Sequence, residues 1–283
     1  MELPHRRIER PLVARIAIAG ACLSALILPG WQTPARCQDG GAEHEVVEPV
    51  VTRETLPVAP GVWDLRLVSD YRSWGGNRVN ASYPLTQLLF GITDRLGAEV
   101  GAPLAYGGEE ARGYGFGDVA VSLKWLLARP SAHLPGVVLG AEAAMPTGSV
   151  ARETGEGIWE LTPYVGLVKD FGSFSLQGNA GRPFSLGTAG GQPVHRYDYN
   201  WALAVPLRHR GIQLLGEING ITASGEEPGQ AAFSPGVHIP LARTVFFGAA
   251  VPVGLNPGAP AWGIVFQFQF AVRAPESEAG ESL

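Results

Sequence analysis

The stretch that decides the fold is GDVAVSLKWLL, residues 117–127. In an extended strand, one face of this stretch would carry the apolar residues Val119, Val121, Leu123, Trp125 and Leu127. The opposite face would carry the polar or small residues Asp118, Ala120, Ser122 and Lys124. Alternation with a period of two is the pattern of a β-strand whose two faces meet different surroundings. The stretch therefore predicts a strand with one apolar and one polar face.

The same alternation recurs along the chain from Gly61 onward, and no long window has helical spacing. Clusters of Gly, Pro, Asn and Asp separate the alternating segments, as turns between strands require. The segments are approximately 61–71, 79–92, 95–106, 116–127, 136–146, 158–169, 173–183, 195–207, 211–222, 231–241, 244–255 and 262–272. An even number of strands is what a closed bacterial membrane barrel needs. The pattern predicts an all-β chain, a transmembrane antiparallel β-barrel of about 12 strands.

The links between these segments alternate in length. Tight links follow the second, sixth, eighth and tenth segments, whereas longer links occupy 147–157, 185–194 and 223–230. Outer-membrane barrels have short periplasmic turns and longer extracellular loops. We therefore expect the N- and C-termini on the periplasmic side, in the outer membrane of a Gram-negative bacterium.

The composition of the 283 residues excludes several classes of protein. Charged residues make up only 17%, and there are 38 Gly and 23 Pro, which excludes a coiled coil, a helical bundle and a charge-rich disordered chain. The net charge is −5 without a basic run, so nucleic acid is not an expected partner. Only Cys22 and Cys37 are present, too few for a disulfide framework or a Cys-based zinc site.

The residue types on the two faces favour a membrane barrel over a soluble one. The polar faces carry only one or two charged residues per strand, among small residues. Such faces are too weakly polar for the exterior of a soluble protein, but they suit the lining of a narrow lumen. Many Trp and Tyr residues of the apolar faces stand near strand ends, where interfacial aromatic girdles lie. A secreted jelly roll or sandwich is the alternative.

The ends of the chain differ from the barrel. Residues 1–35 are predicted to be a cleaved signal peptide, because arginines precede the charge-free stretch Ile16–Leu28. That stretch is too short to span a bilayer, and an uncleaved anchor is the alternative. The remaining divisions are a periplasmic N-terminal extension at 36–60, the barrel at 61–272 and a disordered acidic tail at 273–283.

Three short motifs in this order resemble a known family. They are LFGITDRL at 89–96, GFGD at 115–118 and MPTG at 145–148. The sequence resembles the outer-membrane proteins grouped as "MetA-pathway of phenol degradation", described also simply as transporters. This resemblance covers most of the chain after the signal peptide. It implies an outer-membrane β-barrel that passes aromatic or other hydrophobic compounds.

Charged residues at inward-facing positions are the candidate site. The candidates for lining the lumen are Asp64, Arg66, Asp70, Arg72, Glu99, Asp118, Lys124, Glu142, Glu160, Arg196, Asp198, Glu217 and His238. Either they form structural ion pairs between strands or they line a path for solutes. We expect Lys124 to lie beside Glu142 on the neighbouring strand. No catalytic residue, metal site or cofactor is predicted, and Gly117-Asp118 is interpreted as a turn rather than a phosphate or calcium loop.

Two functions of different class remain open, and neither is enzymatic. The first is a passive channel or uptake porin for small compounds, with aromatic or hydrophobic ones as the class that the resemblance implies. The second is a non-conducting barrel with a structural or surface-interaction role. An outer-membrane hydrolase is less favoured, because no barrel histidine has a serine two residues away in its strand. Expected partners are outer-membrane lipid, a small-molecule solute and, during biogenesis, the barrel assembly machinery.

Overall fold

The computed structural model describes residues 49–75, 78–106, 114–186, 196–207, 211–223 and 228–273. The expected signal peptide at 1–35 lies outside the described residues, as does the tail after Arg273. Of the expected extension at 36–60, the structure describes only Pro49–Pro60.

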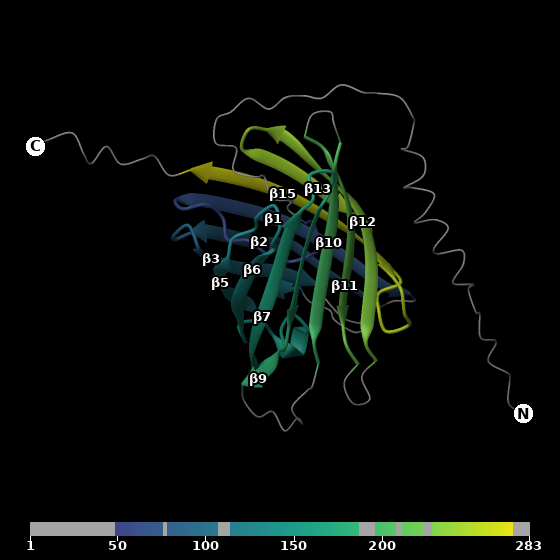
Figure 1. Ribbon diagram of the computed structural model, residues 1–283. Coiled ribbons are helices and arrows are strands. Elements are labelled where there is room, and N and C mark those ends of the chain that lie inside the picture. Colours follow the sequence, from purple (N-terminus) through teal and green to yellow (C-terminus); the bar gives the residue numbers. More distant parts are fainter. Residues whose placement is uncertain are drawn as a thin grey trace, which may run out of the picture. The chain divides into compact units, whose positions relative to one another are not determined.

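The described residues form one closed antiparallel barrel (Figure 1). The elements are β1 Val62–Gly75, β2 Arg78–Gly91, β3 Leu96–Tyr106, β4 Tyr114–Phe116, β5 Val119–Ala128, β6 Gly136–Met145, η1 Val150–Arg152, β7 Trp159–Asp170, β8 Ser175–Gly181, β9 Phe184–Leu186, β10 Asp198–Pro206, β11 Gln213–Ile221, β12 Gln230–Ala242, β13 Val245–Ala250, β14 Val253–Gly254 and β15 Trp262–Arg273. The short strands β4 and β9 pair only with β3 and β7. β14 follows β13 after a break at Val251-Pro252, and both pair with β12 and β15. The prediction of a 12-stranded barrel is confirmed.

The barrel closes where the first strand meets the last. β1 pairs with β15 in an unbroken register from Val62 opposite Arg273 to Ser73 opposite Trp262. Closure leaves none of the twelve wall strands at the edge of the sheet, so each of them pairs with a neighbour on both sides.

Residues of β5 illustrate how the alternating pattern distributes the side chains. Leu123 is 52% and Trp125 50% exposed on the outer surface, whereas Ser122 and Lys124 are each 2% exposed inside. The apolar faces therefore point outward and the polar faces inward, as predicted. An outer surface of apolar side chains suits contact with lipid, because lipid tails are themselves apolar and form no hydrogen bonds that such side chains would interrupt. The described residues contain no helix of the length and apolar character that crosses a bilayer.

The links define two ends of the barrel, which we call the turn end and the loop end. At the turn end lie 92–95, 129–135, 171–174 and 243–244, together with the end of β10 and the start of β1. At the loop end lie the starts of β5, β7, β10, β12 and β15. One link differs from the expectation: β1 and β2 extend so far that only residues 76–77 separate them at the loop end.

Candidate functional site

The lumen of the barrel is partly filled by the chain itself. Residues Pro49–Pro60, which we call the lumen segment, precede β1 and form hydrogen bonds with side chains of four wall strands, β1, β6, β8 and β11. Val50 is 5% and Thr55 0% exposed. We expected 36–60 to be a periplasmic extension, and the structure instead has its described part inside the barrel. Hydrogen bonds to the wall make this position favourable for an otherwise aperiodic stretch.

Glu217 on β11 is the first anchor of the lumen segment. Its carboxylate, 0% exposed, accepts backbone N–H groups from Val50 at 3.0 Å, Val51 at 3.0 Å and Thr52 at 2.5 Å. Hydrogen bonds to an ionised acceptor are about twice as strong as neutral ones. One buried acid therefore satisfies three consecutive backbone donors that would otherwise be buried without partners.

Arg53 is the second anchor, and it contacts the part of the wall formed by β6, β7 and β8. Its Nη2 donates to Glu142 Oε1 on β6 at 2.7 Å, and its guanidinium lies 4.8 Å from the ring centre of Tyr164 on β7. The Asn179 side-chain amide on β8 donates to the Arg53 carbonyl at 3.1 Å. Arg53 thus joins the lumen segment to three strands through its charge and its backbone.

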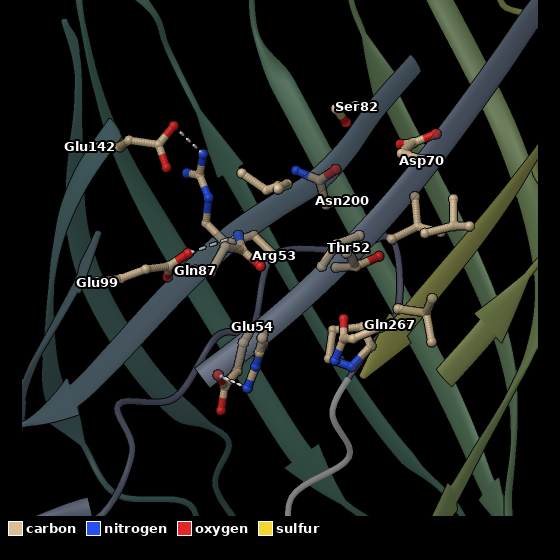
Figure 2. A pocket seen from close by; sticks show the side chains of 17 residues that line it. Thr52, Arg53, Glu54, Asp70, Ser82, Gln87, Glu99, Glu142, Asn200 and Gln267 are labelled. Atoms are coloured by element: carbon tan, nitrogen blue, oxygen red, sulfur yellow. Dashed lines mark hydrogen bonds and ion pairs between the residues drawn. The ribbon is translucent and has the colours of Figure 1, made fainter. Parts of the chain in front are cut away.

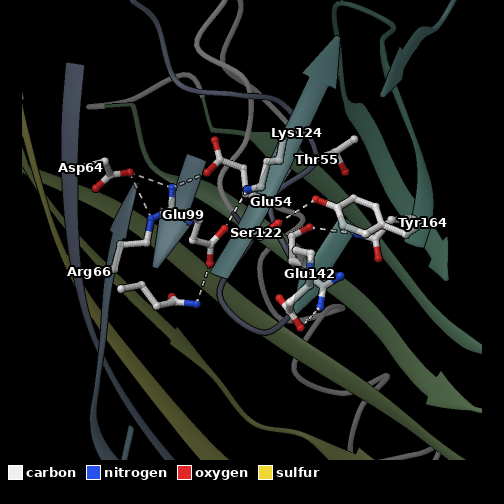
Figure 3. Close-up of polar contacts among 12 residues, drawn as sticks. Glu54, Thr55, Asp64, Arg66, Glu99, Ser122, Lys124, Glu142 and Tyr164 are labelled. Carbon is white, nitrogen blue, oxygen red and sulfur yellow. Dashed lines mark hydrogen bonds and ion pairs between the residues drawn. The ribbon is translucent and has the colours of Figure 1, made fainter. Parts of the chain in front are cut away.

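Glu54 connects the lumen segment to β1 near the turn end (Figure 3). Arg66 Nη2 lies 2.7 Å from Glu54 Oε2 and 2.8 Å from Asp64 Oδ2. Gln269 on β15 also donates to Asp64 Oδ2, at 2.9 Å. The Arg66 side chain is 5% exposed, so this group is a buried ionic network across the seam where the barrel closes.

Glycines on the wall make room for the lumen segment. The residues whose added Cβ would meet it within 3 Å are Gly91, Gly97, Gly166 and Gly248. At Gly91 a Cβ would lie 1.9 Å from the Ala59 carbonyl oxygen, and at Gly166 it would lie 2.6 Å from Thr55 Cγ2. Any other residue would displace the segment or the wall. The inner surface is therefore shaped to seat Pro49–Pro60.

Three asparagines form a chain of amides across the lumen wall. Asn219 on β11 donates to Asn200 on β10, and Asn200 donates to Asn179 on β8, each at 3.0 Å. Asn219 also donates to the Thr52 hydroxyl at 3.0 Å. This amide chain links the wall to the lumen segment without using charge.

The buried pairing of Lys124 differs from our expectation. Lys124 Nζ lies 2.9 Å from Glu99 on β3, not beside Glu142. Glu99 and Glu142 both lie opposite Ser122, on the two strands that flank β5, so either could reach Lys124. Arg53 of the lumen segment forms an ion pair with Glu142, so Lys124 pairs with Glu99 instead. The expectation was wrong because the sequence pattern did not reveal a charge coming from outside the wall.

The other predicted residues occupy varied surroundings. Arg72 pairs with Asp70 at 2.5 Å, and Arg196 with Glu160 at 2.8 Å, on the loop-end half of the barrel. His238 is 6% exposed and stacks on Phe246 with ring centres 5.4 Å apart. Whether these side chains line a path for solutes stays a prediction.

Asp118 has a structural contact set that explains two of the sequence motifs. Its carboxylate accepts the backbone N–H of Gly148 at 2.8 Å and of Glu156 at 2.7 Å. The Thr147 hydroxyl donates to the Gly117 carbonyl at 3.0 Å. The GFGD motif at 115–118 and the MPTG motif at 145–148 therefore hold the 146–158 loop against the start of β5. The Asp118 carboxylate stabilises a turn here, which is the role expected from the sequence.

Adjacent cavities lie between the lumen segment and the wall, and Figure 2 shows the side chains that line one of them. One of about 290 Å³ lies among Arg53, Glu99 and Glu142. A second of about 450 Å³ lies toward the loop end and shares Val51, Asp70, Ser82 and Asn200 with the first. A third of about 200 Å³ borders the first at Gln87, Glu99 and Glu142. The first cavity is lined mainly by polar groups, whereas polar and apolar groups together line the other two.

Several lumen residues were missed by the sequence argument. They are Arg53, Glu54, Tyr164, Gln177, Asn179, Asn200 and Asn219. The four on β8, β10 and β11, namely Gln177, Asn179, Asn200 and Asn219, alternate with outward apolar residues. The alternation of inward and outward residues could have identified these four, if uncharged amide side chains had been counted as lumen candidates along with the charged ones. Arg53 and Glu54 lie in an aperiodic stretch and gave no such signal.

Comparisons with known proteins agree with this architecture. A family model described as "Putative MetA-pathway of phenol degradation" matches residues 68–271. The COG4313 outer membrane channel from Pseudomonas putida F1 is similar in structure, with a TM-score of 0.60, 13% identity, and coverage of 80% of this chain and 100% of that chain. The KdgM porin has a TM-score of 0.52 and 6% identity, covering 73% and 98%. At these identities the structural likeness concerns the fold alone, and no curated protein sequence matches the chain.

Proposed function

Because the chain belongs to the MetA-pathway of phenol degradation family, we propose that it is a passive outer-membrane channel for small solutes. The observation that carries the proposal is the space of about 290 and 450 Å³ beside the lumen segment, in two cavities that share four lining residues, three of them polar. A barrel that served only as a scaffold would not need polar cavities in contact with one another. The lumen segment, held by Glu217 and Arg53, narrows the passage.

The proposal includes an orientation, with the turn end and both termini in the periplasm. Val150, 62% exposed at the loop end, and Leu134, 67% exposed at the turn end, allow a matched test. In a chain with Cys22 and Cys37 replaced by Ser, Val150→Cys should react with a membrane-impermeant maleimide in intact cells, and Leu134→Cys should not. The reverse labelling pattern would invert the proposed orientation.

The charges of the described lumen favour cations over anions. Nine acidic and five basic side chains give a net charge of −4, counting Glu54, Asp64, Asp70, Glu99, Asp118, Glu142, Glu160, Asp198 and Glu217 against Arg53, Arg66, Arg72, Lys124 and Arg196. A narrow lumen of one sign concentrates counter-ions. The proposed channel is therefore cation-selective.

Recordings in planar bilayers test the proposal. Purified protein should give discrete current steps, and in a KCl gradient the reversal potential should have the sign of K⁺ selectivity. Raising the salt should weaken that selectivity, since the Debye length falls from about 10 Å at 0.1 M to about 3 Å at 1 M. An absence of current, both from the whole chain and from a variant lacking residues 49–57, would instead support the non-conducting structural barrel.

The solute class has two candidates. The lining of the first cavity supports small water-soluble solutes, because it offers many hydrogen-bonding groups. The family description favours the second candidate, aromatic compounds such as phenol. Swelling rates of liposomes in phenol and in a polar solute of similar size would separate the two. Faster swelling in phenol would support the aromatic class.

A further inference from the structure

The cavity of about 450 Å³ at the loop end, which we call the vestibule, has an unusual charge arrangement. Arg72 and Asp70 both line it, and they bind each other through two hydrogen bonds, at 2.5 and 2.8 Å. Their charges therefore cancel locally. Asp198, at the start of β10, lines the same cavity.

Asp198 is a carboxylate without a direct partner among the described residues. It has no ion pair within 4.0 Å and no side-chain hydrogen bond in that part of the chain. The nearby guanidinium groups of Arg196 and Arg53 are held by Glu160 and Glu142, at 2.8 and 2.7 Å. The described vestibule lining thus carries one uncompensated negative charge, which disfavours an anion and favours a cation.

The neutral groups of the vestibule suit a cation that also donates hydrogen bonds. Asn200 and Asn219 stand on the same wall, held by their own amide chain. The Trp74 ring also borders the cavity, and its indole N–H donates to the Gly258 carbonyl at 3.3 Å. Aromatic faces attract ammonium groups, and amide oxygens accept their hydrogen bonds.

We propose that the vestibule is a binding site for small protonated amines, with Asp198 as the counter-ion. A protonated amine brings one positive charge and three N–H donors, and both match the lining. The site would select amines before the solute reaches the lumen segment. The inference rests on the proposed function only in treating the vestibule as the solute entrance.

Isothermal titration of the whole chain in detergent micelles tests the site without requiring conduction. Glucosamine, glucose and glucuronate are the probes, because these pyranoses are similar in size and differ in charge. Glucosamine should bind about tenfold more tightly than glucose, and glucuronate should not bind detectably. Asp198→Asn should lower the glucosamine affinity to that of glucose. Asp198→Glu, which keeps the charge, should retain most of the preference.

Asp94→Asn is the matched control. This carboxylate is exposed at the turn end, where it pairs with Arg129, and its loss should leave glucosamine binding unchanged. Heat-modifiable migration on gels would establish that each variant has a folded barrel. Equal affinity for the three sugars, or an equal loss in Asp94→Asn and Asp198→Asn, would overturn the amine site.

The two proposals fail in different ways. Wild-type protein that conducts K⁺ but does not prefer glucosamine would overturn the amine site and leave the channel. Protein that binds glucosamine through Asp198 but never conducts would support the amine site and remove the channel.

Discussion

Replacing Glu217 with Ala should release the lumen segment and raise the single-channel conductance several-fold. The substitution removes the only side chain that accepts the N–H groups of Val50, Val51 and Thr52 in the described structure. Each buried donor left without a partner costs about 1–3 kcal/mol, and water in the widened lumen can supply the missing bonds only if the segment moves. Planar-bilayer recordings at one salt concentration would measure the change.

Two further variants make this expectation specific. Glu160→Gln removes an acid that binds Arg196 and not the lumen segment, so the conductance should stay near the wild-type value. Deleting residues 49–57 removes most of the lumen segment, including Arg53 and Glu54, and should give a conductance at least as large as that of Glu217→Ala. If all variants form folded barrels with wild-type conductance, the segment does not obstruct the passage.

The fold could be predicted from the sequence because, within each strand, the alternation of apolar and polar residues shows which side chains face outward and which face the lumen. In β5, Leu123 and Lys124 are neighbours in sequence with opposite environments, and the period of two suffices to assign them. Closure followed from an even strand number and from the pattern of links. The extent of β1 was underestimated, because Ser73 looks like part of a turn in sequence but continues the pairing with β2 and β15, and Gly75 pairs with Arg78 of β2.

The lumen could be predicted only in part. The alternation of inward and outward residues identifies Glu217 as an inward-facing charge. Its partners Val50 to Thr52, however, lie about 166 residues away in sequence, in a stretch without periodicity. Such contacts depend on the finished barrel. The pairing of Lys124 with Glu99 rather than Glu142 has the same origin, since Arg53 of the lumen segment decides it.

Arg66→Ala should cost about 3–5 kcal/mol of unfolding free energy, because it leaves the Glu54 and Asp64 carboxylates buried without their cation. The two carboxylates are 8% and 2% exposed, so water screens them poorly. Urea titrations of the protein in lipid vesicles, followed by tryptophan fluorescence, would measure the loss. In Arg129→Ala, which breaks the exposed pair with Asp94, the cost should be only about 0–1 kcal/mol.

A triple variant separates the loss of charge balance from the loss of packing. Arg66→Ala combined with Glu54→Gln and Asp64→Asn removes the cation together with both negative charges. If unpaired buried charge causes the destabilisation, the triple variant should be more stable than Arg66→Ala alone, because neutral amides are cheaper to bury than carboxylates. Equal stability of the two variants would mean that Arg66 contributes through the packing of its side chain. In that case the seam between β1 and β15 would depend on the volume of Arg66 and not on its charge.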